Sequence, residues 1–85
     1  MQIVYRPKFV REFKRFPREI QELVAQKEEI FYRDPFDPRL KTHKLRGRLY
    51  GFYAFWMDYR RRIIFYFATP EIAYFVAIGG REIYD

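Results

Sequence analysis

Several residue types that common active sites require are missing from this sequence, or nearly so. The chain has no cysteine, which excludes a disulfide framework and a thiolate metal site. It has no serine, which excludes a Ser-His-Asp triad, and with His43 as its single histidine a structural zinc site is also excluded in practice. No Gly-rich phosphate loop or dinucleotide fingerprint occurs. We therefore expect neither a metal ion nor an organic cofactor.

Long apolar runs are missing as well. Charged residues interrupt the sequence every few positions from its beginning, which excludes a signal peptide. No apolar run approaches the roughly 20 residues that a membrane-spanning helix needs. At 85 residues the chain should form one domain, residues 1–85, with a small core. We expect a soluble, cytoplasmic protein that does not associate with membranes.

Acidic residues are scarce in one part of the chain. Residues 39–62 contain eight lysines and arginines but only one acid, Asp58, and therefore carry a net charge of +7. The whole chain has a net charge of +6, so the positive excess lies in this window. A concentrated positive charge attracts polyanions, of which nucleic acid is the most common, although a solvated basic face is the alternative. The shortage of carboxylates also argues against a bound Mg²⁺ ion.

The first half of the chain contains helical patterns. Residues 2–6 alternate in polarity and end before Pro7, which predicts a short strand. Phe9, Phe13 and Phe16 then recur at helical spacing, so a first helix should bury this aromatic face. A second helix is predicted from about residue 17 to residue 32, before two Asp-Pro steps stop it.

The second half of the chain is rich in β-branched and aromatic residues, which favour strands. Three strands are predicted, at residues 52–59, 62–67 and 71–79, joined by a basic turn and by a turn at Thr69–Pro70. The order β-α-α-β-β-β predicts an α+β fold in which two N-terminal helices pack on one face of a small antiparallel sheet.

Alternation along the strands assigns side chains to the two faces of this sheet. One face should carry Arg62, Ile64 and Tyr66, opposite Ile63, Phe65 and Phe67. In the last strand one face should carry Ile72, Tyr74, Val76 and Ile78, opposite Ala73, Phe75 and Ala77. Both faces are apolar, and two helices can cover only one of them. We therefore expect the other face to bind a protein partner or to act as a recognition surface.

The residues that could carry chemistry are tyrosines and a set of cations: Lys41, His43, Lys44, Arg46, Arg48, Arg60, Arg61, Arg62 and Arg81. Such a set suits RNA cleavage without a metal ion, in which the ribose 2′-OH attacks the neighbouring phosphorus. Arginines stabilise the charge that develops on the phosphate oxygens, while a lysine or tyrosine could act as base or acid. The same residues also describe a simple binding surface for nucleic acid.

Several short motifs, in their order and spacing, resemble the RelE/ParE superfamily of toxins from type II toxin–antitoxin systems. The motifs are FKRFP at residues 13–17, DPFDPRLKTHKLRG at 34–47, YRRRIIF at 59–65 and IGGREIY at 78–84. The resemblance extends over nearly the whole chain. It implies an antitoxin protein as partner and, for the RelE branch, a RelE-like fold and cleavage of mRNA on the ribosome. The ParE branch instead inhibits DNA gyrase and is not a nuclease.

The resemblance also assigns roles to individual residues. Arg62 and Arg81 match arginines that would stabilise the scissile phosphate, and Tyr84 matches a C-terminal tyrosine implicated in catalysis or base stacking. These three are the predicted catalytic residues. The predicted RNA-binding residues are Lys41, His43, Lys44, Arg46, Arg48, Arg60 and Arg61. Among them, His43 is a secondary candidate for catalysis.

Other interpretations stay open at the level of the sequence. The chain could be a ParE-type gyrase inhibitor or a basic nucleic-acid-binding module without activity. Arg62 could pair with Asp58 across the turn, and Tyr84 could be a partly buried packing residue. The aromatic residues Phe52, Tyr53, Phe55 and Trp56 are interpreted as core and interface rather than as a platform for stacked bases.

Overall fold

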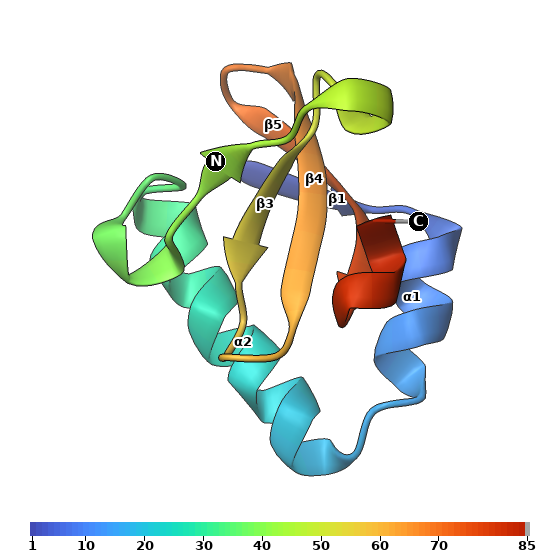
Figure 1. The fold of residues 1–85 in the computed structure, drawn as a ribbon. Coiled ribbons are helices and arrows are strands. Elements are labelled where there is room, and N and C mark those ends of the chain that lie inside the picture. Colours follow the sequence, from blue (N-terminus) through green and yellow to red (C-terminus); the bar gives the residue numbers. More distant parts are fainter. Residues whose placement is uncertain (85) are drawn as a thin grey trace.

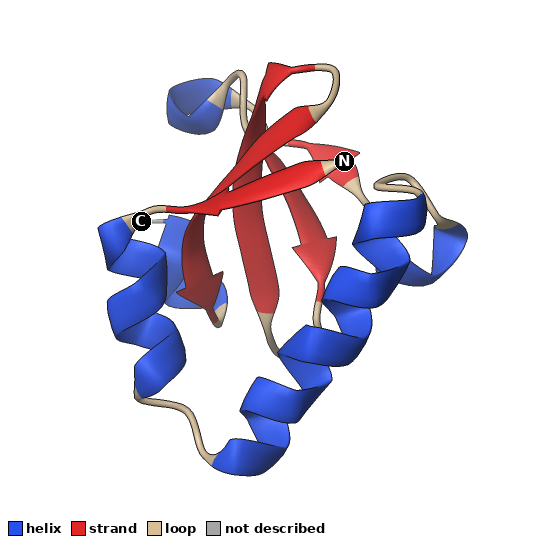
Figure 2. Ribbon diagram, turned by 180° about the vertical axis from the view of Figure 1, so that it is seen from behind, coloured by secondary structure: helices blue, strands red, loops and turns tan. Residues whose placement is uncertain are grey.

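The structure, a computed structural model that describes residues 1–84, consists of two helices and a five-stranded sheet (Figure 1). The strands are β1 (Gln2–Tyr5), β2 (His43–Lys44), β3 (Tyr53–Trp56), β4 (Arg62–Thr69) and β5 (Ile72–Gly79). The helices are α1 (Pro7–Lys14) and α2 (Arg18–Arg33), and short 3-10 turns form η1 (Pro38–Leu40), η2 (Gly47–Leu49) and η3 (Arg81–Tyr84). Figure 2 shows both helices lying over one face of the sheet, so the predicted α+β fold is confirmed.

The sheet is mixed rather than purely antiparallel. Its strand order is β1-β5-β4-β3-β2, and the strands from β2 to β5 form the predicted antiparallel ladder. β1 runs parallel to β5, with Gln2 opposite Ile72 and Tyr5 opposite Phe75. The prediction is wrong for this strand because no hairpin joins β1 to β5, so no local turn fixes their relative direction.

A β-bulge in β5 changes which side chains share a face. The register between β4 and β5 shifts at Ile64, which makes Val76 an extra residue without a β4 partner. Beyond this bulge Ala77 lies with Ile64 on one face, while Ile78 joins the core on the other. The predicted alternation of β5 therefore fails from Ala77 onward, because the bulge at Val76 resets the two-residue period.

Prolines define the beginnings of both helices. Pro7 occupies the first turn of α1, and Pro17 is the N-cap residue of α2. Phe16, directly before Pro17, therefore lies outside both helices, although its spacing continues the face of α1. Gln21 closes the end of α1, since its side-chain amide donates hydrogen bonds of 3.2 Å to the carbonyls of Phe13 and Phe16.

The main core lies between the helices and the sheet. Phe31 of α2 is fully buried at its centre, with its ring centroid 5.0 to 5.4 Å from those of Phe55, Phe65 and Phe75. Three of these four rings come from three neighbouring strands, so α2 is fixed across β3, β4 and β5. Burial of rings in edge-to-face contact makes this cluster the main source of stability in a small domain.

The chain itself covers part of the sheet face opposite the helices, which we call the open face. A second cluster there contains Ile64, Ala77 and Ile83, with Leu45, Leu49, Phe52, Val76 and Tyr84 packed against it. The leucines belong to the basic segment 39–51, and Ile83 and Tyr84 belong to η3, which lies over the sheet in Figure 1. The expectation that a protein partner covers part of this face, or that the face is a recognition surface, stays a prediction, and it now concerns only the part that the basic segment and η3 do not cover.

Candidate functional site

An open pocket of about 570 Å³ lies on the open face, where β2, β3, β4 and η3 converge. We call it the cationic pocket, and its lining residues are His43, Trp56, Tyr59, Arg60, Arg62, Arg81 and Tyr84. All three predicted catalytic residues lie here, together with two of the predicted RNA-binding residues, His43 and Arg60. No carboxylate lines the pocket among the described residues, so its electrostatic potential is strongly positive.

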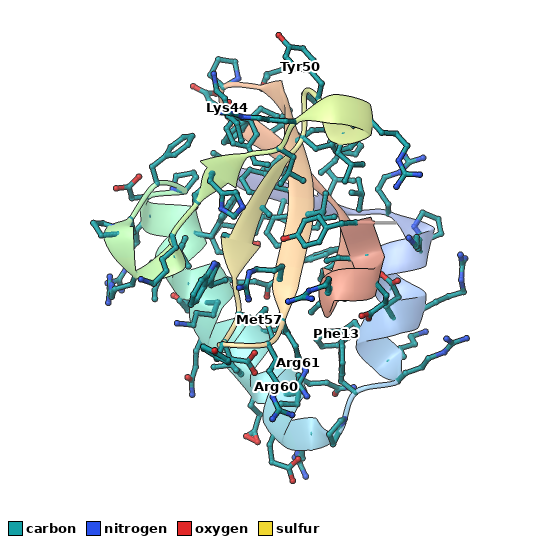
Figure 3. All side chains as sticks on the ribbon, in the orientation of Figure 1. Phe13, Lys44, Tyr50, Met57, Arg60 and Arg61 are labelled. Carbon is teal, nitrogen blue, oxygen red and sulfur yellow. The ribbon has the colours of Figure 1, made fainter. Side chains whose placement is uncertain are left out.

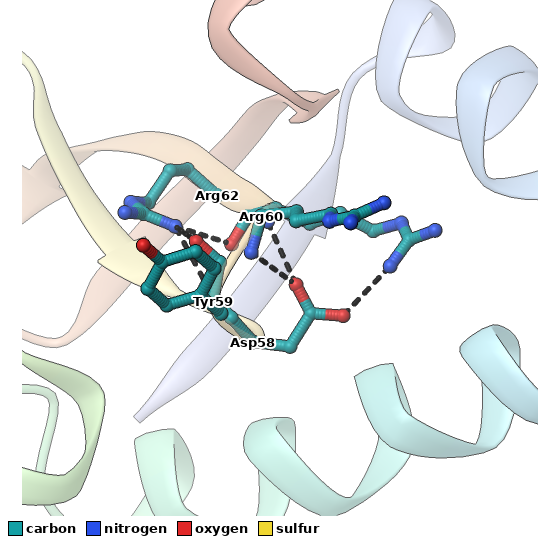
Figure 4. Close-up of polar contacts among 5 residues, drawn as sticks. Asp58, Tyr59, Arg60 and Arg62 are labelled. Atoms are coloured by element: carbon teal, nitrogen blue, oxygen red, sulfur yellow. Dashed lines mark hydrogen bonds and ion pairs between the residues drawn. The ribbon is translucent and has the colours of Figure 1, made fainter.

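Arg62 opens β4 and is held from two sides. Its Nη1 donates hydrogen bonds to the backbone carbonyls of Asp58, Tyr59 and Arg61, at 3.1, 3.3 and 3.2 Å (Figure 4). The centre of its guanidinium also lies 4.0 Å from the centroid of the Trp56 ring. These bonds all come from Nη1, so residues 1–84 leave the Nε and Nη2 donors available for an anion. The fixed fork is suited to binding a phosphate.

Asp58 organises the turn between β3 and β4. Its Oδ1 accepts hydrogen bonds from the backbone N–H groups of Arg60 and Arg61, and its Oδ2 forms an ion pair of 2.7 Å with Arg61. Partial burial opposes ionisation, but the bonds from the two N–H groups and from the Arg61 guanidinium prevail and lower the pKa of Asp58. The carboxylate thus pairs with Arg61, and not with Arg62.

Arg61 does not line the cationic pocket. Besides its bond to Asp58, its guanidinium lies 5.5 Å from the ring centroid of Phe16, on the helical side of the turn. Arg60 and Arg61 are neighbours in sequence, but only Arg60 contributes to the pocket. The predicted role of Arg61 in RNA binding has no support from this placement.

His43 lies in β2, the two-residue strand at the edge of the sheet. Its Nδ1 is 3.0 Å from the carbonyl oxygen of Lys41. A carbonyl can only accept, so the hydrogen bond requires a proton on Nδ1, and in the neutral ring Nε2 is then a proton acceptor. This tautomer makes His43 a stronger candidate for a general base than the sequence suggested.

Arg81 and Tyr84 belong to η3, whose position depends on close packing. A Cβ atom at Gly79 would lie 2.6 Å from Cγ2 of Ile83, so only glycine allows η3 to approach β5 this closely. Arg48 donates a hydrogen bond of 2.7 Å to the carbonyl of Tyr84 and so fixes the far end of the turn. Burial raises the pKa of the Tyr84 hydroxyl, and the positive charge of Arg62 offsets this only in part. Tyr84 is therefore a neutral phenol, able to donate a proton.

Two pocket residues were missed or misjudged from the sequence. Trp56 was interpreted as core or interface, yet it lines the pocket and contacts both Arg62 and, at 5.0 Å from its ring centroid, the Lys41 ammonium. Tyr59 was not singled out. Strand alternation contained a signal for Trp56, because the buried Phe55 beside it faces the helices and Trp56 pairs with Arg62. Phe55 is a core residue, as predicted.

The remaining predicted RNA-binding residues lie outside the pocket. Lys44 lines a separate hollow of about 240 Å³ with Tyr50 and Tyr53, and Figure 3 shows Lys44 and Tyr50 at the opposite end of the molecule from Arg60. Arg46 is exposed beside η2, and Arg48 is engaged with the Tyr84 carbonyl. The basic segment is therefore not one uniform patch.

No group of three or more His, Asp or Glu side chains that could hold a metal ion occurs within residues 1–84. None of the helices in this part of the chain is long and apolar enough to span a membrane.

Comparisons with known proteins give matches among solved structures alone. No family model and no curated protein matches the chain. YafQ from E. coli strain BL21(DE3) has a TM-score of 0.80 at 15% sequence identity, covering 98% of this chain and 96% of that chain. The YoeB/ParE toxin from Agrobacterium tumefaciens has a TM-score of 0.79 at 14% identity, covering 95% of this chain and 99% of that one.

A third similar structure is a chain of the toxin–antitoxin complex RelBE2 from Mycobacterium tuberculosis. Its TM-score is 0.78 at 16% identity, and the alignment covers 94% of this chain and 96% of that chain. Near-complete coverage in both directions at such low identity means that the likeness lies in the arrangement of the backbone. The chain therefore has the same fold as these solved toxin structures.

Proposed function

We propose that this protein is the toxin of a type II toxin–antitoxin pair and that it cleaves mRNA on the ribosome. The observation that carries the proposal is the cationic pocket, in which three arginines, a histidine and two tyrosines converge and to which the described residues contribute no carboxylate. Its position on a RelE/ParE-like fold adds support. A pocket with this positive charge would repel cations and would bind the phosphate backbone of RNA.

The reaction we propose is attack of a ribose 2′-OH on the adjacent phosphorus. The bond from the 2′-oxygen to phosphorus forms and the bond from phosphorus to the 5′-oxygen breaks, which leaves a 2′,3′-cyclic phosphate and a free 5′-OH. Negative charge grows on the non-bridging oxygens during this step. Arg62 and Arg81 are the residues we assign to stabilise that charge, since a guanidinium can bind two phosphate oxygens at once.

His43 and Tyr84 are the residues we assign to proton transfer. His43 would accept the 2′-OH proton on Nε2, because Nδ1 already donates to the Lys41 carbonyl. Tyr84 would donate its phenolic proton to the departing 5′-oxygen; burial raises the pKa of this hydroxyl and so keeps it protonated, although it does not make it a stronger acid. The protons then balance, with one moved onto the imidazole and one removed from the phenol.

The partner we propose is an antitoxin with an acidic segment. The +7 charge of residues 39–62 would attract such a segment, and the apolar rings of Tyr5, Tyr32 and Phe36 are exposed for contact with it. One of the similar structures is itself a toxin–antitoxin complex, which supports this proposal.

The test uses ribosomes programmed with a defined mRNA and the purified protein, with cleavage followed by primer extension. We expect wild-type protein to cut the mRNA, and Arg62→Ala, Arg81→Ala and His43→Ala each to lower the rate by about 10²- to 10³-fold. Arg33→Ala is the matched control, because Arg33 is exposed at the end of α2 and its loss changes the net charge equally.

Intact mRNA after incubation with folded wild-type protein would remove the endonuclease from the proposal. Growth arrest that persists in Arg62→Ala and Arg81→Ala, with DNA damage and uncut mRNA, would favour the ParE-type alternative. Expression without any effect on growth would favour a basic binding module without activity.

A further inference from the structure

Tyr59 is an exposed aromatic residue at the edge of the cationic pocket. Its side chain is 83% exposed, whereas the other aromatic pocket residues, Trp56 and Tyr84, are both half-buried. Its one ring contact within residues 1–84 is an edge-on approach to Trp56, with ring centroids 6.5 Å apart. Packing of the fold therefore does not explain why a large ring stands at this position.

The turn that carries Tyr59 is held firmly. Asp58 accepts bonds from the two N–H groups that follow Tyr59, and the backbone N–H of Met57 donates to the carbonyl of Arg61 at 2.9 Å. Arg62 donates to the Tyr59 carbonyl itself. The backbone on both sides of the ring is thus fixed, so binding a base would have to order the Tyr59 side chain but not the turn that carries it.

Tyr59 also stands beside the groups that would bind phosphate. It lines the same pocket as Arg60, Arg62 and Arg81, and no acid of the described chain lines that pocket. In single-stranded RNA each phosphate is flanked by bases whose flat faces are available for stacking. An exposed ring next to arginines is the arrangement by which proteins bind such strands.

We infer that Tyr59 forms a base-stacking subsite, which takes the unpaired base of a nucleotide next to the phosphate bound by Arg62. The ligand class is single-stranded RNA, and the inference rests on the proposed function while naming a contact beyond the reacting atoms. Stacking of this base on Tyr59 would keep it from stacking on the neighbouring bases of the strand. Binding would then depend on the presence of a base at this one position.

The single tryptophan of the chain, Trp56, allows this to be measured without a label, because it lies in the pocket. The probes are RNA trinucleotides with 2′-deoxyribose at each possible cleavage position, so that they bind without being cut. Three further probes lack one base each, at the first, second or third position, and keep the same phosphates. Tryptophan fluorescence is titrated with each probe at fixed salt.

The variants are Tyr59→Ala, Tyr59→Phe and, as matched control, Tyr50→Ala. Tyr50 is 84% exposed and belongs to the same basic half of the chain, but it lines the separate hollow with Lys44. We expect Tyr59→Ala to bind the complete trinucleotide about tenfold more weakly, while Tyr59→Phe and Tyr50→Ala bind it as wild type does. One of the abasic probes should bind wild type about tenfold more weakly, and Tyr59→Ala should not distinguish that probe from the complete one.

Equal binding of the complete trinucleotide by Tyr59→Ala and wild type would overturn the inference, as would an equal loss in Tyr50→Ala. Absence of any fluorescence change with wild-type protein would overturn it too. The proposed function fails separately: Tyr59-dependent binding without cleavage of ribosome-bound mRNA removes the endonuclease and keeps the subsite. Cleavage by wild type with Tyr59-independent binding removes the subsite and keeps the endonuclease.

Discussion

Asp58 is the one acid in the most basic part of the chain, and its contacts determine which arginines are available for a ligand. Its carboxylate engages Arg61 and two backbone N–H groups, so Arg61 is turned toward Phe16 and away from the cationic pocket. Arg62 bonds to the backbone of the same turn and keeps two nitrogens for a phosphate. A sequence with three consecutive arginines cannot reveal this division, because it depends on the path of the turn.

Replacing Asp58 by Asn should destabilise the fold at neutral pH and have no effect in strong acid. Folding lowers the pKa of Asp58, so its stabilising contribution is complete above the unfolded value of about 3.9 and is lost as the pH falls through the lower folded value. We expect Asp58→Asn to lose about 1 kcal/mol at pH 7, because partial exposure of the ion pair weakens it.

The measurement is urea unfolding of both proteins at about pH 7 and in strong acid, where the Asp58 carboxyl is protonated in both the folded and the unfolded state. Glu29→Gln, which removes an exposed acid on α2, is the control. An equal stability difference at both pH values would mean that the charge of Asp58 contributes nothing.

Among the elements of the fold, η3 forms one wall of the cationic pocket, and its position determines whether the predicted catalytic residues lie close together. Arg81 and Tyr84 lie on this short turn, and Gly79 allows the turn to approach β5 closely. Glu82 stabilises the start of η3, since its carboxylate accepts from the N–H groups of Gly80 and of Glu82 itself, which lowers the pKa of this acid. The pocket thus depends on local packing at the two neighbouring glycines, Gly79 and Gly80.

Gly79→Ala should displace η3. The added Cβ would stand 2.6 Å from Ile83 Cγ2, a distance that the side chain of a buried residue must relieve by moving. We expect a loss of stability of about 1–3 kcal/mol, typical of overpacking, and a loss of mRNA cleavage larger than the unfolded fraction explains. Chemical denaturation and the ribosome cleavage assay measure the two effects.

Gly80→Ala is the matched control for this change. A Cβ there would lie 2.9 Å from the carboxylate of Glu82, a flexible side chain that can move, and at an ordinary contact distance of 3.6 Å from the carbonyl oxygen of Arg60. A similar loss in both variants would show that flexibility of the glycine pair, and not the close approach at Gly79, is what η3 requires.

The two helices and the strands β1, β3, β4 and β5 could be predicted from the sequence because each has a local cause. Pro7 and Pro17 start the helices, and runs of β-branched and aromatic residues form β3, β4 and β5. The short elements β2, η2 and η3 could not be predicted, since two to four residues carry no periodicity. The bulge at Val76 was equally hidden, because it arises from pairing with β4.

Only part of the candidate site could be predicted from the sequence. Arg62 and Arg81, to which the resemblance assigns roles, both line the pocket, and those roles stay predictions. The sequence assigns both His43 and Lys44 to RNA binding, but the structure separates His43, in the pocket, from Lys44, in the other hollow. Adjacent residues of a strand point to opposite sides, and a two-residue strand was not recognised.

Positive charge on the whole molecule extends beyond the cationic pocket. A long RNA should therefore bind more tightly than an RNA that contacts the pocket alone. Lys44 and Arg46 lie outside the pocket but within the +7 window. If each contacts one phosphate of a longer strand, the affinity should fall more steeply as salt is added. The slope of the logarithm of the binding constant against the logarithm of the salt concentration should steepen by about 0.7 for each contact.

The double variant Lys44→Ala and Arg46→Ala should therefore bind a single-stranded 12-mer RNA with a salt slope reduced by about 1.4, while Arg33→Ala keeps the wild-type slope. Fluorescence titration at several salt concentrations measures both. An unchanged slope in the double variant would mean that these two cations do not contact RNA.

The parallel pairing of β1 with β5 also determines the order in which parts of the fold can form while the chain is being synthesised. Gln2 and Ile72 are neighbours in the sheet although they are far apart in the chain, so β1 cannot pair until β5 has been synthesised. Contacts of such large sequence separation form late and slow folding. Arg81 and Tyr84 follow β5, so a nascent chain lacks one wall of the cationic pocket until the last of these residues emerges. A complete pocket can therefore form only after the chain has been made as far as Tyr84.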